Sequence, residues 1–188
     1  MKTRKSILLF CTVLVMITCY SCKPTVTDFT EIAQFKPDDK HFTTSLKGLH
    51  FLTETSAIPR VDTLFTQMIT VYDLPVTAHG CKDGVYTGES PWNAYDYKNV
   101  AKVKIKGGKI VSIDYDEVHY DGHGKQDDRE YNKEMSITGT TPAEAYLRYE
   151  NQLLKSQDIN EVDGVTGASY SLYRFKYAVI MALIKASL

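Results

Sequence analysis

The chain has 188 residues, of which 43% are hydrophobic and 24% are charged, and its formal net charge is −1. This length suits one domain with an extension, or two small domains. A chain with so little net charge lacks the basic surface that nucleic-acid binding requires, so we expect no nucleic-acid partner.

The N-terminus has the pattern of an export signal. Three basic residues, Lys2, Arg4 and Lys5, precede an apolar segment at residues 7–18. This segment is too short to cross a bilayer, which takes about 20 apolar residues, so residues 1–21 are predicted to be a cleaved signal peptide. Cleavage removes three basic residues and no acidic ones, which changes the net charge from −1 to −4.

The signal ends in Ser21 and Cys22, which resembles a bacterial lipoprotein signal. In such signals the cysteine is lipidated and becomes the mature N-terminus. Lipidated Cys22 would anchor the protein to the cell membrane or the outer membrane, in the periplasm or on the surface. The alternative is a secreted protein that is cleaved nearby and keeps Cys22 free. With Cys22 acylated, Cys81 has no partner for a disulfide within the monomer, and a lone cysteine is more often inert than reactive.

Residues 22–80 are predicted to be a tether and an N-terminal extension of uncertain structure. The segment 61–72 is rich in Thr, Val and Ile, as strands are. Its large apolar residues nevertheless have helical spacing: Val61, Leu64, Phe65, Met68 and Tyr72. Helix and strand therefore both stay open for this segment.

The pattern from residue 81 to 188 indicates one domain. DGVYTG at 83–88 indicates a turn that enters a strand, and residues 100–115 indicate a β-hairpin. A two-residue Gly-Gly loop would leave Val111 and Ile113 on the face opposite Ile110. We expect instead a three-residue loop, 106–108. That loop pairs Val103 with Val111 and gathers the apolar residues on one face: Ala101, Val103, Ile105, Val111, Ile113 and Tyr115.

Residues 116–135 are polar and contain several glycines, which predicts a long loop. His119, Asp121 and His123 alternate there in HYDGH. Alternation directs side chains to one face only in a strand, and the glycines favour a loop. We therefore expect no metal site.

Two helices are predicted in the last third of the chain. Thr141, Pro142 and Glu144 indicate a helix start with a capping box. That helix should end near Ser156, with its inward residues at Tyr146, Leu147, Leu153 and Leu154. Residues 158–162 are expected to return to the sheet. A mostly buried final helix should begin near Ser171, which makes an α+β fold: a small, mostly antiparallel sheet packed against two or more helices.

DGVTGASYS, residues 163–171, lies between these helices. Its two glycines permit backbone conformations that side chains forbid. The free N–H groups at a helix start favour a phosphate, and three hydroxyls lie close to that start: Thr166, Ser169 and Ser171. On local physics alone, the segment is either a helix cap of small residues or a phosphate-binding turn.

The segment resembles the attachment motif of the FMN-binding domain in the NqrC and RnfG subunits of bacterial redox pumps and in small extracytoplasmic lipoproteins. The motif positions are held by Asp163, Thr166, Gly167, Ala168, Ser169 and Ser171. DGVYTG, the hairpin and TPAEAY extend the resemblance over about residues 82–188. In the family, a flavin transferase joins FMN through its phosphate to the hydroxyl after Gly-Ala. That hydroxyl belongs here to Ser169, where a threonine is usual.

The resemblance implies a membrane-anchored, extracytoplasmic flavoprotein that carries FMN and relays electrons between redox partner proteins. Such a protein is an electron carrier rather than a stand-alone enzyme. Trp92, Tyr95 and Tyr97 are candidates for flavin stacking or electron exchange, or else form an aromatic loop on the surface. Two other functions stay open: a binding or assembly lipoprotein that keeps the fold without flavin, and a flavin-bearing subunit of an extracytoplasmic reductase.

Overall fold

The computed structural model describes residues 58–188. The signal peptide, the lipidation site at Cys22 and most of the segment 22–80 lie outside the described residues. The described chain forms a three-stranded sheet and four α-helices: α2 (Ile58–Tyr72), β1 (Gly84–Glu89), β2 (Tyr97–Lys106), β3 (Lys109–His119), α3 (Arg129–Ser136), α4 (Pro142–Ser156) and α5 (Ser169–Ser187). Two short 3₁₀ helices complete it, η2 (Lys125–Asp127) and η3 (Ile159–Glu161).

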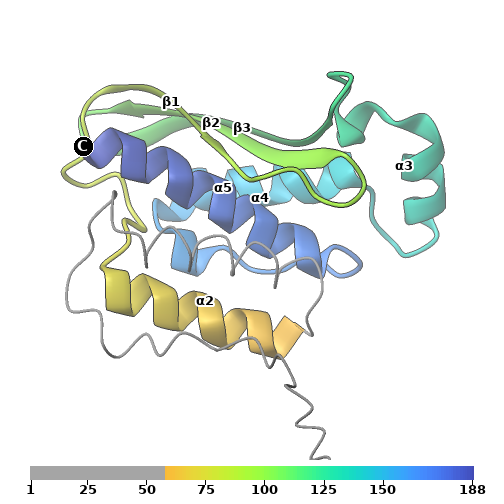
Figure 1. Cartoon of the computed structure of the whole chain (residues 1–188), viewed down its shortest axis with the longest axis horizontal. Coiled ribbons are helices and arrows are strands. Elements are labelled where there is room, and N and C mark those ends of the chain that lie inside the picture. Colours follow the sequence, from red (N-terminus) through yellow and green to blue (C-terminus); the bar gives the residue numbers. More distant parts are fainter. Residues whose placement is uncertain (1–57) are drawn as a thin grey trace, which may run out of the picture.

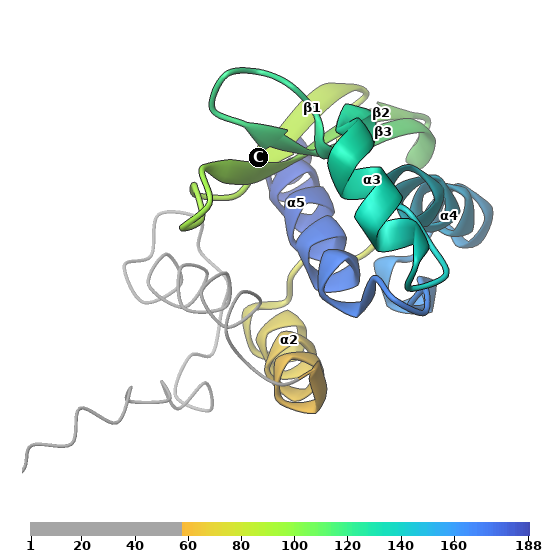
Figure 2. The ribbon, with the colours of Figure 1, turned by 90° about the vertical axis from the view of Figure 1, so that its right-hand side faces the viewer.

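The strands pair antiparallel in the order β1-β2-β3. Helices α5 and α4 cover one face of this sheet, and α2 packs on the side of α5 that faces away from it (Figures 1 and 2). Helix α3 lies beyond the end of the sheet, near the N-terminal end of α5 (Figure 1). The predicted α+β class, with a buried C-terminal helix, is confirmed. None of the helices among residues 58–188 is long and apolar enough to cross a membrane.

Residues 61–72, for which the sequence favoured neither helix nor strand, lie in helix α2. Its buried residues recur every three or four positions: Val61, Phe65, Met68 and Tyr72. This spacing forms one apolar face on a helix, and the face packs into the same hydrophobic core as the sheet and α5. The ring centroids of Phe65 and Tyr173 lie 5.9 Å apart. Burial of the apolar face therefore outweighs the preference of Thr, Val and Ile for strands.

The hairpin between β2 and β3 differs from the predicted three-residue loop. Lys106 pairs with Lys109 across a two-residue turn, in which Gly107 and Gly108 both have positive φ angles of 58° and 70°. The expected pairing of Val103 with Val111 is wrong, because a bulge after Lys104 shifts the register and pairs Val103 with Ile113.

The bulge decides which side chains of β3 enter the core. Ile110 and Ile113 are both buried, whereas Val111 is 47% exposed and lies on the opposite face. A bulge inserts one extra residue into a strand. Ile110 and Ile113 lie three positions apart, and the extra residue between them allows both side chains to point inward although the turn has only two residues. The rest of the predicted apolar face is confirmed as buried: Ala101, Val103, Ile105, Ile113 and Tyr115.

Helix α4 begins with the predicted capping box. The N–H of Glu144 donates to Oγ1 of Thr141 at 3.3 Å, and the N–H of Thr141 donates to Oε2 of Glu144 at 3.1 Å. Tyr146 and Leu153 are buried as predicted, but Leu147 is 57% exposed. The prediction for Leu147 was wrong because the buried face of α4 is centred on the row Ala145, Tyr149 and Leu153.

The segment 158–162 does not return to the sheet. It forms the 3₁₀ helix η3, whose first N–H group, that of Ile159, donates to the carbonyl of Val76 at 2.9 Å. The side chain of Asp158 caps this turn by accepting from the N–H of Asn160 at 2.8 Å. Because a side chain competes for the backbone groups here, a turn replaces a strand. Helix α5 then begins at Ser169, two positions before the predicted start.

Candidate functional site

The loop before α5 is held in place from two sides. The hydroxyl of Tyr149, on α4, donates to the carbonyl of Ala168 at 2.7 Å. Gly167 has a φ of +87°, and a Cβ built on it would lie 2.9 Å from Oγ1 of Thr138. Only glycine combines this left-handed backbone with so close an approach. The Gly167-Ala168 step of the motif is therefore required by the packing of the loop against residue 138.

Helix α5 begins without a side-chain cap. Ala168 occupies the N-cap position, and its side chain has no atom that could accept a hydrogen bond from the first N–H groups of the helix. The first turn of α5 also contains no acidic residue. Uncapped N–H groups and the positive end of the helix dipole together favour an anion such as a phosphate. Ser169, the first helical residue, is exposed.

A cavity of about 260 Å³ opens beside this helix start. Four of the six predicted cofactor-binding residues line it: Gly167, Ala168, Ser169 and Ser171. The wall also contains Tyr131 and Met135 of α3, the segment 140–142, Tyr146 of α4, and Tyr170 and Arg174 of α5. The cavity therefore combines aromatic and apolar surface with one positive charge and several hydroxyls.

The other two predicted residues, Asp163 and Thr166, are exposed and do not line the cavity. Asp163 serves the loop through its backbone. Its N–H donates to Oε1 of Gln152 at 2.8 Å, and its carbonyl accepts from Nε2 of Gln152 at 3.3 Å. This pair of bonds joins the beginning of the motif to α4.

A buried carboxylate lies behind two of the cavity residues. Glu117, on β3, has an exposed fraction of 0%. Its Oε2 contacts Nζ of Lys125 at 2.8 Å and Nη1 of Arg174 at 3.3 Å. Its Oε1 accepts a hydrogen bond from the hydroxyl of Ser171 at 3.3 Å. Glu117 thereby fixes the positions of two side chains, Ser171 and Arg174, that line the cavity.

The ionisation of Glu117 depends on its two basic partners. Burial alone raises the pKa of this carboxyl, but Lys125 and Arg174 lower it by more, so the pKa lies below its usual value. Burial lowers the pKa of Lys125, but the charge of Glu117 and its hydrogen bond, together with smaller contributions, raise it above its usual value. The pair is therefore ionised at neutral pH, as a buried pair with good geometry requires.

The hydroxyl of Tyr146 is buried and makes no well-aligned hydrogen bond to a described residue, but the carboxylate of Glu117 lies close enough to accept one. Burial and the neighbouring charge of Glu117 raise the pKa of Tyr146 well above its usual value, so the hydroxyl keeps its proton. Because Tyr146 belongs to the cavity wall, this proton can be donated to Glu117 or to a molecule bound in the cavity.

The aromatic residues of the loop 90–97 do not line the cavity. Trp92 is 50% exposed and Tyr95 is 78% exposed. Tyr97 is half-buried and lies 5.1 Å below Nζ of Lys125. The exposure of Trp92 and Tyr95 is that of an aromatic surface loop, and a role of these residues in electron exchange stays a prediction.

Cys81 is buried and lies 3.8 Å from the carbonyl of Leu183. Burial raises the pKa of its thiol. A raised pKa disfavours the nucleophilic thiolate, so Cys81 has the environment of an inert core cysteine.

Sequence reasoning missed Glu117 and Arg174. Strand alternation after Ile113 and Tyr115 places Glu117 on the inward face, where a charged residue signals a buried partner. Arg174 follows Ser171 by three positions on a helix and therefore shares its face. Both signals are present in the sequence.

Comparison with known proteins gives two informative similarities. The "15 kDa lipoprotein" of Treponema pallidum is 33% identical over 81 residues, which are 43% of this chain and 57% of that protein. This chain thus matches just over half the length of that relative. The solved structure of the CPE2226 protein of Clostridium perfringens matches with a TM-score of 0.53 and 32% identity, over 56% of this chain and 88% of the other. No family model matches the chain.

Proposed function

We propose that the protein is a membrane-anchored, extracytoplasmic flavoprotein that carries FMN on Ser169 and acts as an electron carrier. The observation that supports this most directly is the position of the Ser169 hydroxyl. It belongs to the uncapped first turn of α5 and lies at the wall of the 260 Å³ cavity. A phosphate on this hydroxyl would meet the N–H groups of the helix start.

The cavity residues suit the rest of the cofactor. Gly167 presents its backbone to the cavity, and Tyr131, Met135 and Tyr146 offer apolar and aromatic surface for a flat ring. Arg174 brings a positive charge, and Glu117 holds it in place. Bound FMN would supply the redox chemistry, since a flavin accepts two electrons and releases them singly. The protein would anchor the flavin and limit its contact with water.

The covalent attachment would require an activated flavin donor and a transferase as maturation partner. The Ser169 oxygen would form a bond to the phosphorus while the leaving group departs from it, and the serine proton would pass to a base. The exposed position of Ser169 leaves this hydroxyl accessible to a transferase.

The lipid anchor is the second part of the proposal. Cys22 follows a predicted export signal, and the relative in Treponema pallidum is named a lipoprotein. An acyl chain on Cys22 would hold the domain at a membrane surface, where redox partner proteins would reach the flavin.

The test is to co-express the full-length chain with a bacterial flavin transferase and to examine it on a denaturing gel. We expect in-gel flavin fluorescence and an added mass of one FMN. Ser169→Ala should abolish both, and Ser169→Thr should retain them. Ser112→Ala is the matched control, since this exposed hydroxyl on β3 lies outside the motif and does not line the cavity, and its loss should leave the labelling intact.

Two outcomes would contradict the covalent proposal. One is a colourless parent protein, which would favour a lipoprotein that binds or assembles without flavin. The other is flavin that stays on the denatured Ser169→Ala variant. To separate a carrier from a reductase subunit, the labelled protein would be reduced and mixed with an oxidised one-electron acceptor. Electron transfer that needs no further subunit supports the carrier.

A further inference from the structure

The end of β3 and the loop that follows it bring together three side chains that do not line the cavity. The chain turns sharply there, since the N–H of His119 donates to the carbonyl of His123 at 2.9 Å and the N–H of Gly122 donates to the carbonyl of His119 at 2.9 Å. Gly122 permits this turn with a φ of +96°. The loop that we expected to scatter HYDGH instead gathers His119, Asp121 and His123.

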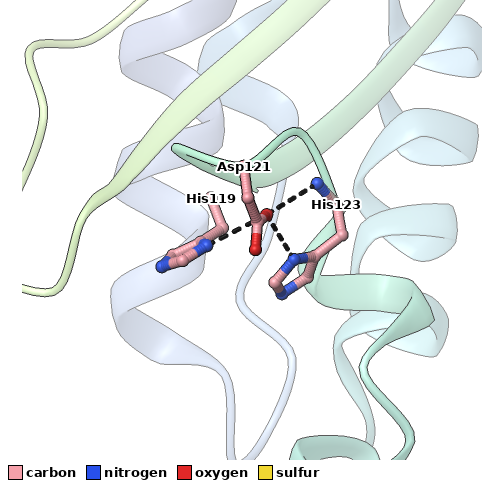
Figure 3. Close-up of side chains that lie close together, drawn as sticks. All are labelled: His119, Asp121 and His123. Atoms are coloured by element: carbon pink, nitrogen blue, oxygen red, sulfur yellow. Dashed lines mark hydrogen bonds and ion pairs between the residues drawn. The ribbon is translucent and has the colours of Figure 1, made fainter.

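The two imidazoles lie on either side of one carboxylate (Figure 3). Nδ1 of His119 lies 3.0 Å from Oδ1 of Asp121, and Nδ1 of His123 lies 2.5 Å from the same oxygen. Each residue offers one ligand atom, and the three atoms all lie within 4.8 Å of one another. Tetrahedral ligands of an ion at about 2.0–2.1 Å lie about 3.4 Å apart. Small side-chain rotations would therefore bring these three atoms around one ion.

The surroundings of His119 hold its ring in one place. Its Nδ1 is buried and faces the Asp121 carboxylate at 3.0 Å, without the alignment of a good hydrogen bond. Its ring lies between aromatic neighbours, with centroids 5.0 Å from Tyr97 and 4.4 Å from Tyr120. The nitrogen is therefore positioned beside the carboxylate before any ion binds, as a preorganised metal ligand is.

We propose that His119, Asp121 and His123 bind a divalent transition-metal ion such as zinc. Two imidazoles and one carboxylate form a three-ligand set that leaves the fourth tetrahedral position open. Imidazole nitrogen favours zinc, copper and nickel over magnesium and calcium, which prefer oxygen ligands. The ion would close the loop 119–123, just before Lys125, which pairs with Glu117. This site does not depend on flavin at Ser169.

The test is calorimetric titration of the full-length protein, purified in detergent and stripped of metal, with Zn²⁺ at neutral pH. We expect one ion per chain with an affinity that His123→Ala and Asp121→Asn each weaken at least tenfold. His79→Ala is the matched control, because His79 is an exposed histidine outside the cluster. His41 and His50 are retained in every variant, so any zinc that they bind is unchanged between the parent and the cluster variants.

A second measurement guards against variants that fold poorly. Zn²⁺ should raise the melting temperature of the parent and of His79→Ala, since a ligand that binds the native state stabilises it. It should not raise that of Asp121→Asn, whose own melting without metal reports its folding. Zinc affinity that is equal in the parent and in a His119→Ala/His123→Ala double variant would overturn the site. Mg²⁺ that binds as tightly as Zn²⁺ would overturn its assignment to transition metals.

Discussion

The hydroxyl of Ser171 donates a hydrogen bond of 3.3 Å to Oε1 of Glu117. Ser171 lies in the first turn of α5, and Glu117 lies on β3, fully buried. The same carboxylate contacts Lys125 and Arg174 through its other oxygen. One side chain of the sheet therefore joins the start of α5, the cavity and the segment after the HYDGH loop.

Replacing this carboxylate should destabilise the whole domain. Glu117→Ala would remove the carboxylate that Lys125 and Arg174 both contact, and their side chains are only 13% and 15% exposed. Loss of one partner from a buried pair costs about 3–5 kcal/mol. Urea denaturation of parent and variant at neutral pH measures the difference in the free energy of unfolding.

The matched control is the exposed ion pair between Lys98 and Glu89, at 2.9 Å. Glu89 is 44% exposed, so Glu89→Ala should cost about 0–1 kcal/mol. Because the pKa of Glu117 is lowered in the folded state, its contribution is present above the usual pKa and lost as the pH falls through the folded value. If Glu117→Ala lowered the free energy of unfolding by no more than Glu89→Ala does, the buried pair would not be an important contributor to stability.

The register of the hairpin gives a second prediction. Ile110 is 2% exposed and Val111 is 47% exposed. Ile110→Ala should therefore cost about 2–5 kcal/mol, whereas Val111→Ala should change stability by about 0.5 kcal/mol or less. Thermal and urea unfolding of the two variants distinguish them. The three-residue loop expected from the sequence would give Val111→Ala the larger loss.

The hairpin shows what sequence patterns could predict and what they could not. Alternation identified the inward residues of β2 because each of them is buried on a regular strand. On β3 it identified Ile113 and Tyr115 but failed at Ile110 and Val111. A bulge there changes the alternation by one residue, and its position depends on the pairing partner rather than on local sequence. Both the turn and the bulge are needed to bury Ile110 and Ile113 together.

The residues of the candidate site that are contiguous in the sequence could be predicted. Those that other helices contribute through tertiary packing could not. Ser169 and Gly167 could be identified because the motif is contiguous. Tyr131 and Met135 could not, because they reach the cavity from α3, inside a segment that was predicted to be a loop. That helix is only eight residues long and is capped by Asp128, whose side chain accepts from two backbone N–H groups. Its apolar residues are too few to give a clear period.

Glu150 should make stability depend on pH. It lies on α4 and accepts a hydrogen bond of 2.7 Å from the N–H of Tyr115. Burial raises its pKa from 4.5 to about 7, and Asp114 and Asp116 contribute to the rise. The folded chain therefore keeps a proton that the unfolded chain loses, so stability falls as the pH rises from 4.5 to about 7.

Glu150→Gln tests this dependence because glutamine keeps the acceptor and stays neutral. The variant should be more stable than the parent at about pH 8 and close to it at about pH 4. The free energy of unfolding in urea, measured across this range, gives both profiles. Stability of the variant should still fall with pH, but with a smaller slope, because burial also raises the pKa of Asp116 to about 6. Parallel profiles for parent and variant would rule out Glu150 as the cause.

Gly167 combines a left-handed backbone with a close neighbour, so Gly167→Ala should be costly. Its φ is +87°, and a new Cβ would lie 2.9 Å from Oγ1 and 3.1 Å from the carbonyl oxygen of Thr138. The backbone strain alone costs about 1–2 kcal/mol, and the contact with a backbone oxygen adds to it. Thermal unfolding measures the loss of stability, and flavin labelling by a transferase reports the shape of the loop.

Gly164→Ala is the control from the same motif. A Cβ there would have its nearest neighbour at 3.8 Å, in the side chain of Leu172, so the change should be within about 0.5 kcal/mol. Equal melting temperatures for the two variants would mean that the loop before α5 can move away from Thr138. In that case the packing of Gly167 would not explain why glycine precedes Ala168 and Ser169, and the geometry of the cavity at Ser169 would not depend on this contact.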